Sequence, residues 1–386
     1  MTVRGRASLL LGSTLIVLAA TPAQADTLRD ALNGAYRTNP TLQAARAQQR
    51  ATDETVPIEK SAGRPSATGT AQYIEFVKQS SSNFTAPRRA INAGIDLGVP
   101  IYSGGAVKNA VKAAETRVEA GQADLRGTES AIFTQVVAAY MDVIRGEALV
   151  GLSGNQVEVL TVNTQATSDR FEIGDLTRTD VAQSQARLAL AQGDFRTAQA
   201  NLVSAREAYI QLTGMAPDNL QPPPPLPGLP ANVEDAVAVA LEDNPDLIAA
   251  RERAEASRFD IDVAGSGRLP RVSVFTGGDY SNYLGTISSA QPNVSIPQTS
   301  TAVQAGVSMS IPIFQGGRPA ALQRQAQARS AAALENVIAA ERDVIAQVRS
   351  AWSSWLAATQ IIASNQTAVD AASLSLEGVR AENTVG

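Results

Sequence analysis

The residue types that carry out most protein chemistry are scarce in this chain. Its 386 residues include no histidine, which removes the commonest general base and the commonest metal ligand. They also include no cysteine, so disulfides and lipid attachment through a thiol are excluded. Aspartate and glutamate remain, but no carboxylate pair stands out from the charges expected on helix surfaces, so we expect no enzyme, cofactor or metal site. The net charge of −5 argues against a nucleic-acid partner, which requires clustered lysine and arginine.

The first 25 residues have the pattern of an export signal. Arg4 and Arg6 form a basic start, an apolar run covers 9–20, and Ala23-Gln24-Ala25 matches a cleavage site. We expect cleavage after Ala25, which makes the mature chain a secreted or envelope protein. The alternative, an uncleaved anchor helix, is disfavoured because the apolar run is shorter than the roughly 20 residues needed to span a bilayer.

The rest of the chain repeats one pattern. Asn39-Pro40-Thr-Leu42 recurs 205 residues later as Asn244-Pro245-Asp-Leu247. The segment 91–105 recurs 212 residues later at 303–317. An aligned duplication of this length indicates two copies of one supersecondary unit.

Each copy is predicted to run from short helices through two strands to long helices. The first copy covers 26–220, with helices in 27–61, strands at 66–78 and 90–102, and long helices at 106–173 and 177–213. A proline-rich linker at 221–232 leads to the second copy, 233–386, with helices in 233–263, strands at 270–282 and 301–313, and a long helix at 318–385. Thr27 and Asp30 form a predicted capping box. Asn39 and Asn244 are predicted N-caps, each followed by a first-turn proline.

The second strand of each copy has one continuous apolar face. The alternating apolar residues are Ile91, Ala93, Ile95, Leu97, Val99 and Ile101, and then Val303, Ala305, Val307, Met309, Ile311 and Ile313. Polar residues, glycine and proline fill the positions between them, which is typical of strands. Each run is long enough to cross a membrane as a tilted strand of roughly 9 to 11 residues. A hairpin in a soluble protein is the alternative if these strands stood alone.

The long helices are predicted from a seven-residue spacing of large residues. Its clearest members are Val181, Leu188, Phe195, Leu202 and Tyr209, and the second copy continues the spacing through Val348, Trp355 and Ile362. This spacing predicts helices packed by coiled-coil rules, so we expect these residues to lie in the core. A continuous helix over 106–173 would be on the order of 100 Å long.

Taken together, these features resemble the TolC family of outer-membrane efflux proteins over essentially the whole mature chain. The residues that carry the resemblance are Pro100-Ile-Tyr-Ser-Gly104-Gly105, its copy Pro312-Ile-Phe-Gln-Gly316-Gly317, the Asn-Pro helix starts, and Arg170-Phe-Glu-Ile-Gly174-Asp-Leu176-Thr-Arg-Thr179-Asp180-Val. Single motifs such as Pro-x-aromatic-x-Gly-Gly are weak, and the match depends on their order and duplication.

The resemblance implies a mixed α and β membrane protein made mostly of long α-helices. In this family a homotrimer forms a coiled-coil-like α-barrel in the periplasm, and four β-strands per protomer contribute to one twelve-stranded β-barrel in the outer membrane. The implied function is a passive exit duct of a tripartite efflux or type I secretion system. Its implied partners are outer-membrane lipid, a periplasmic adaptor protein, and either a resistance-nodulation-division pump or an ABC transporter in the inner membrane.

The resemblance also assigns roles to particular residues. Arg170, Gly174, Leu176 and Gly386 fall at the periplasmic tip turns that contact the adaptor, Thr179 and Asp180 fall at the gate, and Pro100, Gly104, Gly105, Pro312, Gly316 and Gly317 form the strand-to-helix junctions. A ring of Asp180 carboxylates would favour cations. The alternative for Asp180 is a solvated carboxylate in the first turn of a helix.

Two further expectations follow from the pattern. The first copy predicts that a returning helix, equivalent to 175–213, should follow Gly386. A secreted coiled-coil structural protein or adhesin is the alternative function, disfavoured because a stalk has no reason to duplicate strands with lipid-compatible faces.

Overall fold

The computed structural model describes residues 27–79, 87–287 and 294–385. The predicted signal sequence and Gly386 lie outside the described residues. The described chain is mostly helical with four antiparallel strands, which confirms the predicted fold class. It divides into two compact units, one made of the residues up to Asn39 with Ile132–Pro225, the other of Pro40–Ala131 with the residues from Leu226 onwards. The units cut across the two sequence copies because one helix, α4 (Ala106–Glu172), begins in one unit and ends in the other.

The first unit is a helical bundle of α1 (Leu28–Thr38), the second part of α4, and α5 (Arg178–Thr213). The predicted capping box of Thr27 and Asp30 at the start of α1 is confirmed. The core contains Tyr140 and Tyr209, both fully buried, with ring centroids 6.3 Å apart. The Tyr140 hydroxyl donates a hydrogen bond to the Gln221 carbonyl at 2.6 Å. The ring of Tyr140 is therefore buried while its polar end is satisfied.

The helices of the second unit are α2 (Pro40–Asp53), α3 (Thr55–Ser61), α6 (Val233–Asp243), α7 (Pro245–Gly265), the short η1 (Ser266–Arg268) and α8 (Arg318–Val385), together with the start of α4. The Asn244 side chain accepts from two backbone N–H groups of α7, with Pro245 at the first turn, so this predicted helix start is confirmed. α2 ends at Asp53, four residues before Pro57 of α3. Proline has no N–H group, so Pro57 cannot donate the helical hydrogen bond to the Asp53 carbonyl. α7 packs along α8, where Ser257 and Ser330 hydrogen-bond at 3.0 Å.

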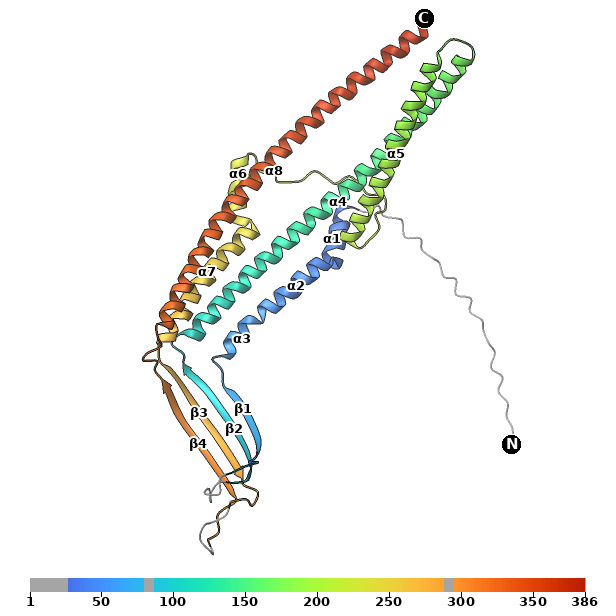
Figure 1. Cartoon of the computed structure of the whole chain (residues 1–386). Helices are drawn as coiled ribbons and strands as arrows, with labels where there is room; N and C mark the ends of the chain where they lie inside the picture. The colour runs from blue at the N-terminus through green and yellow to red at the C-terminus, as the bar shows by residue number, and fades with distance from the viewer. Residues whose placement is uncertain (1–26, 80–86, 288–293, 386) are drawn as a thin grey trace, which may run out of the picture. The chain divides into compact units, whose positions relative to one another are not determined.

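The four strands form one sheet in the order β1-β2-β3-β4, all antiparallel (Figure 1). They are β1 (Ser66–Glu75), β2 (Arg89–Tyr102), β3 (Arg271–Asn282) and β4 (Thr299–Ser310). Because β2 pairs with β3, strands from the two sequence copies lie side by side at the centre. β1 and β4 are therefore the two edges.

The second strands of the two copies end differently. β2 continues through Pro100, which pairs with Ser273, to Tyr102. β4 was predicted to reach 313 but ends at Ser310, before Pro312. β1 pairs with β2 only as far as Gly98, so Pro100 lies where β2 has a single neighbour, β3, and proline is tolerated at such an edge position. β4 ends at Ser310 because this residue pairs with Arg271, the first residue of β3, and no residue of β3 is left to pair beyond it.

Large apolar side chains on the predicted face of the sheet are exposed. Ile95 is 61% exposed, Val303 is 81% exposed and Val307 is 69% exposed. The sheet extends beyond the helix ends of its unit, and Figure 1 shows no helix of this unit over it. None of the described helices combines the length and apolarity needed to cross a bilayer.

Candidate functional site

The apolar face of the sheet is bordered by aromatic side chains at both ends. Tyr73 and Tyr280, which are 56% and 40% exposed, lie towards one end. Tyr102, which is 48% exposed, lies at the end from which the helices start, and Phe314, which is 88% exposed, follows shortly after the end of β4. Exposed aromatic belts on either side of an apolar band are the pattern of strands that meet lipid.

A bulge in β2 brings Tyr102 to this face. The register of β2 against β3 shifts between Pro100 and Tyr102, so that Tyr102 pairs with Val272, a residue of the apolar face. Without the extra residue, strict alternation would put Tyr102 on the polar face, because a bulge inverts the alternation beyond it. The sequence showed the aromatic residue but not the bulge that orients it.

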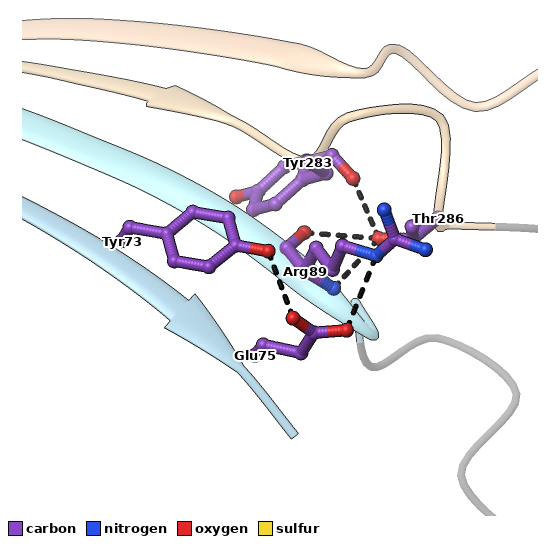
Figure 2. A network of polar contacts seen from close by, with 5 residues as sticks. All are labelled: Tyr73, Glu75, Arg89, Tyr283 and Thr286. Atoms are coloured by element: carbon purple, nitrogen blue, oxygen red, sulfur yellow. Dashed lines mark hydrogen bonds and ion pairs between the residues drawn. The ribbon is translucent and has the colours of Figure 1, made fainter. Parts of the chain in front are cut away.

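A polar network closes the far end of the sheet, and Figure 2 shows its five residues. The Tyr73 hydroxyl donates to Glu75 at 3.0 Å, and Glu75 forms an ion pair with Arg89 at 3.5 Å. The backbone N–H of Arg89 donates to the Thr286 hydroxyl at 3.0 Å. These contacts tie the β1/β2 pair to the segment that follows β3. Sequence reasoning missed this network, because the contact between Arg89 and Thr286 depends on the pairing of the two copies.

The opposite face of the sheet is polar and carries two aspartates at its centre. Asp96 pairs with Gly277, and Asp279 pairs with Gly94, with one pair of the β2/β3 ladder between them. Both aspartates are exposed, and neither has an ion-pair partner within the described part of the chain. The sheet thus presents lipid-compatible side chains on one face and hydrophilic, negatively charged ones on the other.

The predicted strand-to-helix junctions use glycines in the left-handed region. Gly104 and Gly105 have φ of 64° and 83°, and Gly316 and Gly317 have φ of 58° and 80°. Such angles strain any residue with a side chain, which explains the paired glycines. The first junction is crowded, since a β-carbon on Gly104 would lie 2.7 Å from the Leu269 β-carbon, whereas nothing lies within 4 Å of one on Gly316.

The predicted tip turn is a compact helix end. Gly174, with φ of 85°, terminates α4 in a Schellman motif, because the Gly174 N–H donates to the Phe171 carbonyl at 3.0 Å and the Asp175 N–H donates to the Arg170 carbonyl at 2.9 Å. The Arg170 and Asp175 side chains form an ion pair at 2.8 Å across the same turn. Leu176 is half-buried within the turn. Arg170, Gly174 and Leu176 therefore form one local unit, and their predicted partner Gly386 lies outside the described residues.

Asp180, the predicted gate residue, has a local structural role as well. Its carboxylate accepts from the backbone N–H of Thr177 at 2.8 Å and from the Thr177 hydroxyl at 2.7 Å, which completes a capping box at the start of α5. These hydrogen bonds lower the pKa of Asp180, so the carboxylate is ionised at neutral pH. Thr179 is exposed beside it. The Thr-x-x-Asp spacing that predicted the cap at Thr27 is also present here and could have revealed it.

The described residues contain no group of three or more acidic side chains arranged to hold a metal ion. An uncovered sheet with one apolar and one polar face, joined directly to very long helices, defines an envelope protein that enters the membrane through its strands. A profile of the outer membrane efflux protein family matches residues 31–215 and 236–386, and the chain belongs to this family.

Similarity to individual proteins supports the same family assignment. The outer membrane efflux protein BepC of Brucella suis is 32% identical over 98% of this chain and 80% of its own length. The outer membrane protein TolC of Vibrio cholerae is 26% identical over 94% of this chain and 82% of its own length. The crystal structure of CusC superposes with a TM-score of 0.74 at 17% identity, covering 92% of this chain and 81% of CusC, which shows a common fold. The chain is thus an outer-membrane efflux protein, as the resemblance predicted, and not a coiled-coil adhesin.

Proposed function

We propose that three copies of this chain close into one barrel and form a passive exit duct through the outer membrane. The observation that carries the proposal is a four-stranded sheet with an exposed apolar face and two unpaired edges, β1 and β4. In lipid, unpaired strand edges cost several kcal/mol for each unsatisfied group. Pairing β4 of one copy with β1 of the next removes both edges once the ring closes.

The chemistry of the two faces of the sheet indicates which face lies outside the closed barrel and which lies inside it. With the apolar face outward, Tyr73, Tyr102 and their neighbours meet lipid at its two interfaces. The polar face, with Asp96 and Asp279, then lines the lumen. A lumen of this charge suits hydrophilic cargo and favours cations over anions.

The turn between α4 and α5 is the proposed contact for a periplasmic adaptor, with Arg170, Gly174 and Leu176 at its centre. Ile173 in this turn is 80% exposed, so an apolar side chain is available to a partner. Energy would come from an inner-membrane pump of the resistance-nodulation-division class or from an ABC transporter. Gly386 is the proposed equivalent turn position in the second copy.

Conductance and crosslinking test the duct. Protein reconstituted in planar bilayers should give small, cation-preferring openings, and the absence of insertion where a known porin inserts would contradict the duct. The chain has no native cysteine, so cysteines substituted for Thr70 on β1 and Ala302 on β4 can be joined selectively by bismaleimides of graded length. A covalent band that stops at three chains is expected, and a ladder without an end would contradict closure.

A photocrosslinker placed at Ile173 tests the adaptor contact in living cells. Crosslinking to a periplasmic protein is expected from this turn. The same probe at Val303, on the apolar face of the sheet, is the control and should give no protein adduct. Equal labelling from both positions would remove the assigned role of the turn.

A further inference from the structure

A cavity of about 560 Å³ lies where the sheet meets the helices of its unit. Arg271 at the start of β3 and Arg318 at the start of α8 both line it. The lining includes no aspartate and no glutamate. The cavity is therefore positively charged at neutral pH.

These two arginines have no ion-pair partner among the described residues, unlike others in the same unit. Arg117, for comparison, pairs with Asp260, and Arg253 pairs with Asp124. A guanidinium without a carboxylate partner keeps its donors available for an anion, and its planar fork fits phosphate well. Two of them on one cavity form a concentrated anion-binding surface.

The helix ends around the cavity add to the positive potential. α4 begins at Ala106 and α8 begins at Arg318, and both residues line the cavity. Neither helix has an acidic residue in its first turn. The partial positive charges of both N-termini are thus not neutralised locally, and they reinforce the two arginines.

The cavity adjoins apolar surface on its membrane side. Its lining also includes Leu269, Pro312 and Leu322. Pro312 is flanked by Ile311 and Ile313, which follow directly after β4 and are 57% and 95% exposed. A molecule with a phosphate at one end and hydrocarbon at the other matches a positively charged cavity that borders on apolar surface. A free anion would contact only the charged cavity.

Comparison of the two sequence copies indicates that the two arginines are particular to the second strand-to-helix junction. The first-copy equivalents of Arg271 and Arg318 are Ser66 and Ala106, at the same offsets of 205 and 212 residues. Both equivalents are uncharged, although they begin the corresponding strand and helix. The fold of a strand-to-helix junction therefore does not require arginine at either position.

We propose that this cavity binds the phosphate group of an anionic phospholipid at the edge of the membrane, held by Arg271 and Arg318. The proposal rests on the proposed insertion of the sheet into lipid. The shared chemistry is a phosphate oxyanion accepting from two guanidinium groups. The acyl chains of the lipid would continue over Ile311 and Ile313.

The test uses native mass spectrometry of the delipidated protein in an uncharged detergent. The probes are short-chain phosphatidylglycerol, short-chain phosphatidylcholine and inorganic phosphate. The test variant is Arg271→Ser with Arg318→Ala, which installs the first-copy residues. The matched control is Arg342→Ala with Arg349→Ala, which removes the same charge from exposed positions further along α8. Arg271→Lys with Arg318→Lys keeps the charge and should retain partial binding even if the first variant is poorly folded.

Phosphatidylglycerol should bind the native protein, and the test variant should bind it at least about tenfold more weakly, since two charge-assisted contacts are lost. The control should bind normally. Equal binding of inorganic phosphate would assign the site to a free anion in place of a lipid. Binding that survives in the test variant, or falls equally in the control, would overturn the proposal. Conductance of the same samples separates the two ideas, because a variant that loses lipid but forms channels leaves the duct intact.

Discussion

Asp96 lies directly opposite Gly277 in the β2/β3 ladder, with its carboxylate oxygen 2.7 Å from the place that a β-carbon on Gly277 would take. The reverse pair lies alongside, where an oxygen of Asp279 would be 2.9 Å from a β-carbon on Gly94. Each carboxylate therefore rests against the backbone of the neighbouring strand in space that only glycine leaves open. The two copies of the sequence meet at this reciprocal pair.

Gly277→Ala should destabilise the sheet by about 1 kcal/mol, because Asp96 must turn away and the Ile95 carbonyl is also close, at 3.3 Å. Gly69→Ala on β1 is the matched change, since nothing lies within 4 Å of its β-carbon position. It should be neutral or stabilising by up to about 1 kcal/mol, because alanine restricts the unfolded chain. Thermal unfolding in detergent, followed by circular dichroism, measures both. Adding Asp96→Ala should restore the thermal stability of the Gly277→Ala protein. If the stability is not restored, the Asp96 carboxylate is not the group that the new methyl group meets.

Gly104→Ala should cost more than Gly316→Ala, although the two glycines are equivalent in the duplication. Both substitutions place alanine in the left-handed region at a cost of about 1–2 kcal/mol. Only Gly104→Ala adds a collision, since the new β-carbon would meet the Leu269 side chain and would lie 3.2 Å from the Ser266 carbonyl. The difference in the free energy of unfolding should be about 1–3 kcal/mol. Equal effects would mean that η1 moves aside without cost.

Thr177→Val should raise the pKa of Asp180 towards its usual range, because the largest cause of the lowered pKa is the hydrogen bond from the Thr177 side chain. Because the pKa of Asp180 is lowered in the folded state, its ionised carboxylate stabilises the helix start at every pH above the usual carboxyl pKa. This stabilisation is lost as the pH falls through the pKa of the folded state. Hydrogen exchange in the first turn of α5 should therefore quicken in the variant at neutral pH. In the native protein, the protection factor of these amides, which corrects for the slower intrinsic exchange in acid, should fall only at acidic pH.

The same turn allows the gate role of Asp180 to be separated from its capping role. Asp30 forms an equivalent capping box at α1, and its pKa is lowered by the same kind of bond from Thr27. Asp30→Asn and Asp180→Asn should both loosen a helix start. Only Asp180→Asn should change conductance or block by divalent cations if its charge lies at the proposed gate. Equal conductance in the two variants would leave Asp180 with the cap alone.

Glu252→Gln should make the second unit more stable at pH 7.5 and less sensitive to pH. Burial raises the pKa of Glu252, and the negative charges of Glu119 and Glu255 raise it further. Because the folded state then holds a proton more tightly than the unfolded chain, stability falls as the pH rises from the usual carboxyl range through the folded pKa. Urea unfolding of native protein and variant at several pH values measures the slope. Glu335→Gln, at an exposed position on α8, should leave the slope unchanged.

The sequence predicted the elements of this fold better than their contacts. Two-residue alternation and seven-residue spacing are local signals, so the presence of the four strands and the long helices was predicted correctly, although β1 ends at Glu75 and β4 at Ser310, each three residues before the predicted end. The pairing of Asp96 with Gly277 depends on the register between strands from different copies, which no local pattern records. The same limit explains why the polar network of Arg89 and Thr286 and the bulge before Tyr102 were missed.

Seven-residue spacing also predicted more burial than the chain contains. Tyr209 is fully buried, as expected, but Trp355 is 44% exposed and Ile362 is 68% exposed. The described elements that pack against α8 are α6 and α7, which leave these two side chains uncovered. The spacing identifies a face suited to packing but does not identify its partner.

The two edges of the sheet have a genetic consequence. In a closed ring each chain must pair through β1 with one neighbour and through β4 with the other. A mutation can therefore impair one of these two contacts and leave the other intact. A chain with a damaged β4 but an intact β1 can still join a neighbour, yet it leaves that ring open. Such a chain would consume normal partners, and its mutation should be dominant over the normal gene. A chain damaged at both edges would join nothing, and its mutation should be recessive.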